Sequence, residues 1–340
     1  MRLLVTGGAG FIGANFIRYV LDHTDDVHII NLDALTYAGN LASLADVADD
    51  PRYGFQHGDV CDPELVDRLT GDADAIVHFA AESHVDRSID GPAEFLRANV
   101  LGAGVVFEAA RRHGVERCLH ISTDEVYGSI DPPGSFAETD PLEPNSPYAA
   151  SKASADLLAR AYTTTYDYPI MVTRTTNNFG PYHHPEKVIP LFITKLMDGG
   201  RVPLYGDGSN VRDWTFVLDN VAAQWLVLTR GQPGEVYNVG AGNEMSNKEL
   251  TYALLSRFGL TGKAADDRIE FVADRPGHDL RYSVDTSKIR ALGWAPARTF
   301  DEALDATVAW YRQHEPWWRP LEQVGATDRR GVATSSTSKP

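Results

Sequence analysis

A glycine-rich turn close to the N-terminus restricts the fold more than any other feature of the sequence. The apolar run 2–6 leads directly into the segment 7–13 (GGAGFIG), and apolar side chains at helical spacing follow. Gly7, Gly10 and Gly13 have the spacing at which missing Cβ atoms permit a tight turn, close approach of a pyrophosphate and close packing of helix on strand. This strand, turn and helix predict a dinucleotide-binding unit.

An acid after the second apolar run predicts which dinucleotide binds. Residues 27–32 are apolar and end at Asp33, which follows the glycine loop at about the 20-residue distance typical of this unit. A carboxylate there can accept hydrogen bonds from both ribose hydroxyls of NAD, and it repels the additional phosphate of NADP. No Arg or Lys follows Asp33 through Asn40. The sequence therefore predicts NAD as the cofactor.

Short apolar strands alternate with helices through the first half of the chain. We expect further strands at residues 55–60, 75–80 and 117–121, and a helix at 99–112. This order predicts an α/β fold with a doubly wound parallel (Rossmann) sheet, whose ligands lie beyond the carboxyl ends of the strands. Segments 81–84 and 122–125, which follow the fourth and fifth strands, should face the cofactor.

Most of the residues expected to contact NAD lie in the glycine loop or just after a predicted strand, and Asp59 is placed to meet the adenine. The full set is Gly7, Gly10, Phe11, Ile12, Gly13, Asp33, Leu35, Thr36, Asp59, Val60, Phe79, Ala80, Ala81, Ser83, Asn99, Ser122, Tyr148, Lys152 and Asn178.

The character of the sequence changes after residue 180, where prolines become frequent and a glycine-rich segment, 205–208, follows. Residues 236–240 nevertheless read as another strand of the main sheet, so we expect an interleaved boundary and a smaller C-terminal domain for the substrate. The predicted units are an NAD-binding domain at 1–180 and 213–240, a substrate domain at 181–212 and 241–322, and a polar, disordered tail at 323–340.

Composition argues against several classes of function. The net charge of −16 disfavours nucleic acid as a partner, since such partners attract basic proteins. No apolar run approaches the ~20 residues that cross a bilayer, and no secretory leader precedes the first strand, so we expect a cytoplasmic enzyme without a membrane partner. Cys61 and Cys118 are too far apart for a metal motif and too few for a disulfide framework, so no metal is expected.

Tyr148 and Lys152 predict an oxidation site. Ser146 as N-cap and Pro147 as the first helical residue are a good helix start, which puts Tyr148 and Lys152 one turn apart on one face. The ammonium is expected to lower the pKa of the phenol and to bind a ribose hydroxyl. Tyr148 could then take a proton from a substrate hydroxyl held by Thr123, while hydride leaves for the nicotinamide. The alternative is an ordinary aromatic beside a surface lysine.

Asp124 and Glu125 add an elimination step. Neighbouring carboxyl groups at a strand end point in different directions, so they can address two adjacent atoms of a sugar. Once C4 is a ketone, one carboxylate can remove the acidified C5 proton while a carboxylic acid protonates the departing C6 hydroxyl. A solvated pair of surface acids is the alternative. Together, Thr123, Asp124, Glu125, Tyr148 and Lys152 fit an enzyme that oxidises a sugar, removes water from it and reduces it again.

Over residues 1–320 these motifs resemble the extended short-chain dehydrogenase/reductase superfamily and, within it, the dTDP-glucose 4,6-dehydratases. Phe179 stands where that family commonly has tyrosine, and Thr175 and Thr176 occupy positions where other small residues occur. The matching segments are GGAGFIG (7–13), DALTYAGN (33–40), HFAAESHVDRS (78–88), STDEVYG (122–128), NNFGPY (177–182), YGDG (205–208), RDW (212–214) and DRPGHDLRY (274–282).

The resemblance implies that Tyr148 is the base for C4 oxidation, that Glu125 takes the C5 proton and that Asp124 protonates O6. It also implies dTDP-glucose as substrate, and a homodimer formed by the helices near Asn99 and Tyr148. The implied substrate contacts, several of them at the diphosphate and nucleoside, are Ser83, Thr123, Glu125, Asn178, Lys187, Pro203, Tyr205, Arg212, Asn247, Arg275, His278 and Tyr282.

Other interpretations of the same motifs stay open. UDP-glucose 4,6-dehydratases, nucleotide-sugar 4-epimerases and uronic acid decarboxylases share the glycine loop and Tyr-x-x-x-Lys. Epimerases need no acid pair and decarboxylases typically keep only the glutamate, so Asp124 separates them from dehydratases. A non-catalytic NAD-binding regulator would tend to lose the tyrosine, the lysine or the acids. Physical argument does not choose between thymine and uracil, or between cell-wall and antibiotic sugars.

Overall fold

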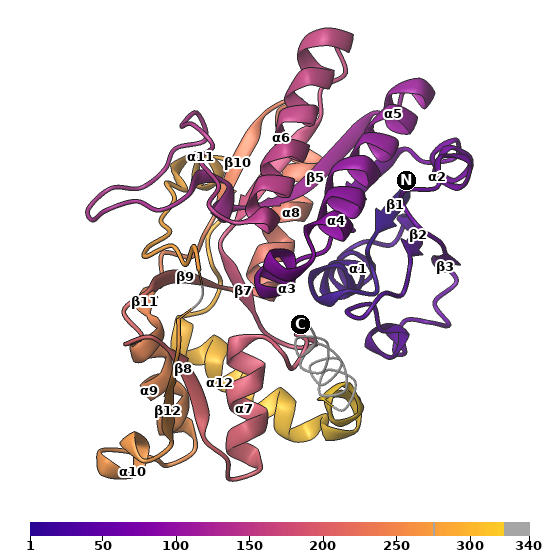
Figure 1. Cartoon of the computed structure of the whole chain (residues 1–340). Helices are drawn as coiled ribbons and strands as arrows, with labels where there is room; N and C mark the ends of the chain where they lie inside the picture. Colours follow the sequence, from indigo (N-terminus) through magenta and orange to yellow (C-terminus); the bar gives the residue numbers. More distant parts are fainter. Residues whose placement is uncertain (275, 323–340) are drawn as a thin grey trace, which may run out of the picture.

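The main sheet of the computed structural model, which describes residues 1–274 and 276–322, has seven strands in the order β10-β6-β5-β4-β1-β2-β3 (Figure 1). Every neighbouring pair is parallel, which confirms the predicted doubly wound α/β fold. The strands are β1 (Arg2–Thr6), β2 (His28–Asp33), β3 (Tyr53–His57), β4 (Ala75–His78), β5 (Arg117–Thr123), β6 (Met171–Thr175) and β10 (Val236–Val239).

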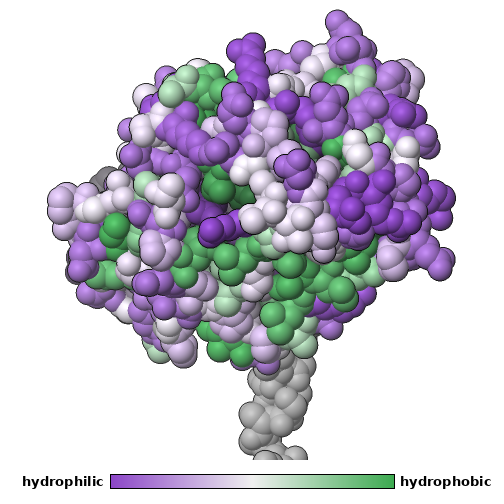
Figure 2. Space-filling view, turned by 90° about the horizontal axis from the view of Figure 1, so that it is seen from above, coloured by the Kyte–Doolittle hydropathy of each residue, from purple (hydrophilic) through white to green (hydrophobic). Residues whose placement is uncertain are grey.

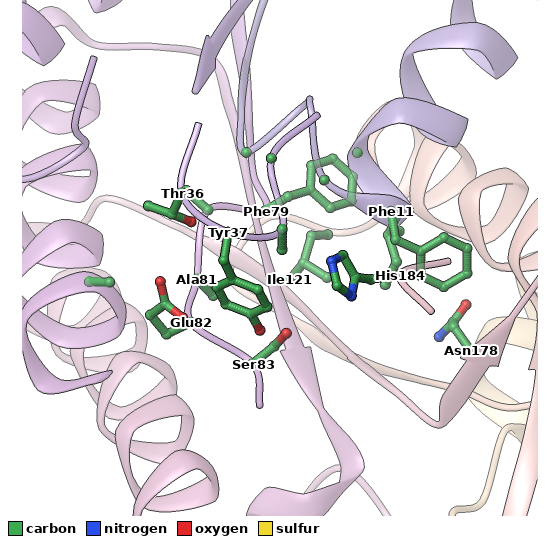
Figure 3. Close-up of a pocket in the computed structure, with 18 of the residues that line it drawn as sticks. Phe11, Thr36, Tyr37, Phe79, Ala81, Glu82, Ser83, Ile121, Asn178 and His184 are labelled. Atoms are coloured by element: carbon green, nitrogen blue, oxygen red, sulfur yellow. The ribbon is translucent and has the colours of Figure 1, made fainter. Parts of the chain in front are cut away.

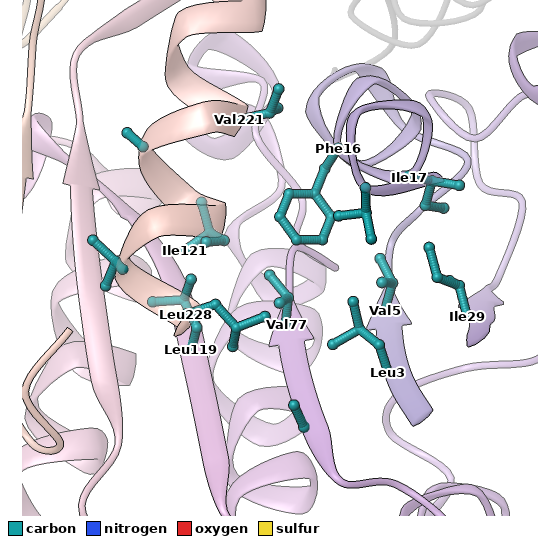
Figure 4. Packing of buried hydrophobic residues seen from close by; sticks show 14 of the residues in the cluster. Leu3, Val5, Phe16, Ile17, Ile29, Val77, Leu119, Ile121, Val221 and Leu228 are labelled. Atoms are coloured by element: carbon teal, nitrogen blue, oxygen red, sulfur yellow. The ribbon is translucent and has the colours of Figure 1, made fainter. Parts of the chain in front are cut away.

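Helices cover both faces of this sheet. On one face, Phe16 and Ile17 of α1 (Phe11–His23) and Val221 of α8 (Val217–Arg230) pack on inward side chains of β1, β4 and β5 (Figure 4). The other face is covered by α2 (Pro63–Thr70), α5 (Ala103–His113) and α6 (Pro147–Tyr166). Full burial of one such aliphatic side chain contributes about 1.5–3 kcal/mol, so both layers hold the sheet rigidly.

The predicted helix at 99–112 differs from the structure at its start. A π-helical turn, η2 (Leu96–Gly102), precedes α5 and continues from α4 (Pro92–Phe95). Asn99 sits in this turn, where its Oδ1 accepts a hydrogen bond from the Glu82 amide at 2.8 Å and its Nδ2 donates to the Glu82 carbonyl at 2.9 Å. These bonds fix the segment after β4, and they depend on tertiary contacts that no local pattern reports.

A second, smaller layer packs around its own apolar core, beside the carboxyl ends of the main strands. Its sheets are β11-β9-β7 (Glu244–Ser246, Val211–Phe216, Asn177–Phe179) and β12-β8 (Ile269–Val272, Val202–Tyr205). Its principal helices are α7 (Val188–Met197), α9 (Asn247–Arg257) and α12 (Phe300–Gln313). Since β10 returns to the main sheet, the predicted strand at 236–240 is confirmed, whereas the exact domain boundaries stay a prediction.

The remaining short elements are η1 (Leu41–Leu44), α3 (Val85–Asp90), η3 (Asp124–Tyr127), α10 (Lys263–Asp266) and α11 (Ser287–Ala291). Across residues 1–274 and 276–322, no helix has both the length and the apolar character needed to cross a membrane. The predicted disordered tail, 323–340, and the candidate residue Arg275 lie outside the described residues.

Candidate active site

A cavity of about 390 Å³ opens beyond the carboxyl ends of the main strands, where the parallel sheet predicted it. Figure 3 shows that its walls come from separate segments: Thr36 and Tyr37 from the loop after β2, Ser83 from the segment after β4, and Asn178 from β7. The predicted site residues in its lining are Gly7, Gly10, Phe11, Ile12, Gly13, Asp33, Thr36, Asp59, Val60, Phe79, Ala80, Ala81, Ser83, Ser122, Thr123, Asp124, Glu125, Tyr148, Lys152, Asn178 and Lys187.

The glycine loop leaves no space for side chains on its inner side. Gly7 has a φ of +72°, and a Cβ on it would lie 2.6 Å from the backbone nitrogen of Ala80. A Cβ on Gly13 would lie 2.4 Å from the carbonyl oxygen of Gly7. No side chain caps the first turn of α1, which lines the cavity through Phe11 and Ile12. Its backbone amides and helix dipole therefore suit a pyrophosphate.

Asp33 at the end of β2 is buried, and backbone amides fix its carboxylate. Oδ1 accepts a hydrogen bond from Leu35 N at 2.8 Å, and Oδ2 accepts one from Ala9 N at 2.9 Å. Burial raises the pKa of Asp33 and these two hydrogen bonds oppose that rise. Because each carboxylate oxygen accepts more than one hydrogen bond, both remain able to bind ribose hydroxyls. Leu35 contributes its amide to this turn and does not line the cavity.

Tyr148 and Lys152 both line the cavity from the first turns of α6. The predicted start of this helix is confirmed, since the Ser146 side chain accepts a hydrogen bond from Ala149 N at 3.1 Å and Pro147 is the first helical residue. Lys152 Nζ donates to the carbonyl oxygen of Ile121 at 2.7 Å, and burial lowers the pKa of Lys152 to about 8.

The expected lowering of the Tyr148 pKa by Lys152 stays a prediction, because burial determines the pKa of Tyr148 in this structure. Burial raises the pKa of Tyr148 above its usual range, and the negative charges of Glu125 and Asp124 raise it further. A hydrogen bond with the Thr123 hydroxyl acts in the opposite direction. The phenol is therefore neutral in this structure and must release its proton before Tyr148 can act as a base.

The two neighbouring acids have different environments. Asp124 is only 2% exposed, so the alternative of a solvated surface acid is wrong for this residue. Thr123 Oγ1 donates to Asp124 Oδ1 at 3.2 Å, while Asp124 Oδ2 makes no hydrogen bond within the described part of the chain. Burial and the adjacent charge of Glu125 raise the pKa of Asp124 well above its usual range, and Arg212 only partly opposes them. Asp124 therefore holds its proton more tightly than an ordinary carboxyl group does, and Glu125 lies on the partly exposed side of η3.

Arg212 and Tyr282 stand behind this acid pair and do not line the cavity. Arg212 donates to the carbonyl oxygen of Asp279 at 2.9 Å and lies 4.1 Å over the ring of Tyr282. The Tyr282 hydroxyl donates to Asp279 Oδ2 at 2.7 Å. This packed group joins β9 to the segment at 279–282 and places a positive charge beside Asp124.

Of the remaining predicted residues, Lys187 lies in the cavity lining, whereas Pro203, Tyr205, Asn247, His278 and Asn99 lie outside it. Lys187 Nζ donates to the carbonyl oxygen of Ser83 at 3.0 Å, which ties the start of α7 to the segment after β4. The rings of Tyr205 and His278 meet edge to face, and His278 Nδ1 lies 2.6 Å from an oxygen of Asp274. Pro203 lies in β8 and Asn247 begins α9. Asn99 stays behind the lining, where its Nδ2 also donates to Ser151 Oγ at 2.8 Å.

Sequence reasoning missed a polar cluster at the cavity wall. The Glu186 side chain is only 6% exposed, and its carboxylate lies 3.5 Å from the Arg87 guanidinium and 3.6 Å from His84 Nε2. Arg87 in turn lies 4.0 Å over the ring of Tyr37, which also faces His184 (Figure 3). The motif DALTYAGN contains Tyr37, but no spacing rule links it to a glutamate so distant in the sequence.

The family model described as GDP-mannose 4,6-dehydratase matches residues 4–307 of the chain. The chain belongs to this family. Such a match covers the glycine loop, the acid pair, Tyr148 and Lys152, and most of the smaller layer. The match to the 4,6-dehydratase family therefore covers almost all of the residues that the structure describes.

Individual relatives are similar along nearly their whole length. The low-salt glycan biosynthesis protein Agl12 of Haloferax volcanii is 54% identical over 311 residues, which are 92% of this chain and 98% of the relative. A dTDP-glucose 4,6-dehydratase of Streptomyces niveus is 52% identical over 327 residues, 95% and 96% of the two chains. The crystal structure of DesIV, a dTDP-glucose 4,6-dehydratase of Streptomyces venezuelae with NAD and dTDP bound, superimposes with a TM-score of 0.91. It shares 54% identity, and the match covers 94% of this chain and 100% of DesIV.

Proposed function

We propose that this protein dehydrates dTDP-glucose to dTDP-4-keto-6-deoxyglucose, with NAD as a recycled cofactor. The observation that carries the proposal is the environment of Asp124: a buried carboxyl group with a raised pKa, directly beside Glu125 and sharing Thr123 with Tyr148. Elimination of water needs an acid and a base on neighbouring atoms, and an epimerase has no use for this pair. The similarity to dTDP-glucose 4,6-dehydratases along nearly the whole chain supports the same reaction.

The residues around the cavity fit NAD. Gly7 and Gly13 form a backbone cradle that any Cβ would fill, and Asp33 presents a fixed carboxylate at the position of a ribose. When bound, NAD accepts hydride from C4 of the sugar and returns it to C6. We propose that Lys152 binds the cofactor ribose and that Ser122 and Asn178, whose Oγ and Oδ1 atoms lack hydrogen bonds within the described residues, face the cofactor or the sugar.

The proton transfers follow from the positions of three side chains. We propose that Tyr148, bonded to Thr123, acts as a phenolate when it takes the proton of the C4 hydroxyl during oxidation of that carbon, so the phenol must first release its own proton, which the positive charge of Lys152 favours. Glu125 then removes the C5 proton, and Asp124 gives its own proton to the departing C6 hydroxyl. When hydride is added at C6, Glu125 returns its proton to C5, and Asp124 regains a proton from solvent before the next turnover. Elimination needs Asp124 in its protonated form, and its raised pKa favours that form.

We propose that the nucleoside diphosphate lies against the smaller layer, near Lys187, Asn247 and His278. Arg212 contributes its positive charge while its hydrogen bonds to backbone carbonyls hold it in place. Arg275 remains a prediction for the same group. The cytoplasmic location also remains a prediction.

The expected homodimer has a suitable surface. Leu96, Leu101 and Leu157 on η2 and α6 are each more than half exposed, at 54%, 56% and 55%. In Figure 2 hydrophobic side chains (green) gather along the lower edge of the molecule, the edge that faces the reader in Figure 1, where α4, α5 and α6 lie. We propose that these helices pair with those of a second copy.

Parallel incubations with dTDP-glucose and UDP-glucose test the substrate. The purified protein should convert dTDP-glucose to a product that is one water lighter, as identified by mass spectrometry, and should act much more slowly on UDP-glucose. Conversion to a C4 epimer of unchanged mass would instead support an epimerase. Faster dehydration of UDP-glucose would overturn the thymidine part of the proposal.

A further inference from the structure

A buried charge cluster lies behind Lys152, on the face of the sheet that α6 covers. Asp156 follows Lys152 by one helical turn, so the two side chains share one side of α6. Asp156 is 4% exposed, and its Oδ2 accepts a hydrogen bond from Arg174 Nε of β6 at 2.8 Å. Its Oδ1 has no hydrogen bond within residues 1–274 and 276–322, and it lies 3.8 Å from His120 Nε2.

Arg174 fixes the position of Asp156. Its NH1 donates to the Tyr127 hydroxyl at 2.7 Å and to the Glu138 carbonyl at 3.2 Å. The Tyr127 hydroxyl donates onward to Asn238 Oδ1 at 2.8 Å. Held in this way, Asp156 acts on Lys152 through its charge, while the ammonium itself donates to the Ile121 carbonyl at the cavity wall.

The surroundings of Lys152 make this charge important. Burial favours a neutral lysine and lowers the pKa of Lys152 to about 8, and Asp156 raises it. His78 and His120, which lie behind Lys152 in the sheet, are fully buried and neutral, since burial lowers the pKa of both. The other titratable groups near Lys152 and its cluster are Tyr148 on α6, Asp124 and Glu125 on η3 beside Tyr148, and Arg174 on β6.

We propose that Asp156 is a positioning residue that keeps Lys152 charged and directed toward the cavity. The ammonium can then bind the cofactor ribose and favour the phenolate form of Tyr148. The role in catalysis rests on the function proposed above. The role in binding NAD rests only on the cluster and on the glycine cradle.

The test is the pH dependence of NAD release in Asp156→Asn. Holoenzyme is diluted at a series of pH values, and the release rate is followed by the nucleotide that appears in the filtrate. For the wild type, release should accelerate as Lys152 loses its proton. In the variant the same rise should occur at a pH about one unit lower, the size of shift that a neighbouring charge produces. The alkaline limb of C4 oxidation, followed as reduced-nicotinamide absorbance in a single turnover, should move with it.

Two further variants separate this role from a structural one. Asp156→Asn leaves Arg174 unpaired and could reduce folding, so Asp156→Asn/Arg174→Gln removes both charges and should show the same direction of shift. Asp156→Glu should restore the wild-type midpoint. Glu235→Gln, which removes an exposed carboxylate 2.7 Å from Lys288, is the matched control and should leave the midpoint unchanged.

The outcomes distinguish the two proposals. Faster release at every pH with an unmoved midpoint would overturn the role of Asp156, because a merely structural defect would behave in this way. A shifted midpoint in a protein that does not dehydrate dTDP-glucose would overturn the proposed function and leave the role of Asp156 in NAD binding intact.

Discussion

Asp124 illustrates how one residue can serve catalysis at the expense of stability. A carboxyl group whose pKa is raised on folding keeps its proton in the native protein and loses it more readily in the unfolded chain. The contribution of Asp124 to stability is therefore greatest below the unfolded pKa of about 3.9 and declines as the pH rises toward the folded pKa. We infer that its acid role, and not stability, accounts for a carboxyl group in this buried position.

Replacement of Asp124 should separate oxidation from elimination. In Asp124→Asn the tyrosine, lysine and cofactor site remain, so C4 is still oxidised, but no acid protonates the C6 hydroxyl and its departure should slow by about 10²–10⁴-fold. Stopped-flow absorbance of Asp124→Asn should show reduced nicotinamide appearing faster than product. Tyr148→Phe should form neither reduced nicotinamide nor product. If Asp124→Asn turned over at the wild-type rate, Asp124 could not be the acid that protonates the C6 hydroxyl.

The same variant should be more stable than the wild type, and increasingly so as the pH rises. Asparagine has no proton to lose, so Asp124→Asn avoids the stability loss described above. Denaturant unfolding of both proteins at about pH 5 and about pH 8 measures the difference, which should be larger at the higher pH. An equal or lower stability of the variant at both pH values would contradict the raised pKa.

At the scale of elements, local pattern predicted the strand, glycine turn and helix that bind the cofactor, because each step depends on neighbouring residues. It equally predicted the start of α6 from Ser146 and Pro147. It could not predict the π-helical turn at Asn99, or that burial raises the pKa of Tyr148, since both come from contacts between distant segments. The cluster at Glu186 was missed for the same reason.

The glycine turn itself gives a graded prediction. In Gly13→Ala the new Cβ would fall 2.4 Å from a backbone oxygen, so the loop must move and NAD retention should fall at least tenfold, with about 1–3 kcal/mol lost in unfolding free energy. In Gly10→Ala the nearest protein atom is 3.3 Å away, so the loss of unfolding free energy should be much smaller, whereas NAD retention should still fall because the backbone approaches the pyrophosphate at this position. Thermal unfolding measures the first effect and nucleotide content after gel filtration the second, and equal stability of the two variants would contradict the tight cradle.

At the scale of the whole molecule, we propose that the main sheet supplies the cofactor site, that the smaller layer closes the substrate side, and that the outer helices bind a second copy. Leu101→Asp should convert the expected dimer to monomer, because it places a charge within the surface that the exposed leucines form. The control is Phe271→Asp, which places the same charge at a side chain that is 62% exposed on β12, in the smaller layer and outside the leucine surface. Sedimentation velocity measures the oligomeric state of each variant. A monomeric wild type would contradict the proposed interface.

The central claim is that hydride removed from C4 returns to C6 of the same sugar, so that NAD is not consumed. dTDP-glucose carrying deuterium at C4 should be incubated with the protein without added cofactor, and the product analysed by mass spectrometry and NMR. We predict a product one water lighter with the deuterium in its C6 methyl group and no accumulation of NADH. Loss of the label, or one NADH formed per sugar, would show a simple dehydrogenase and contradict the proposed reaction.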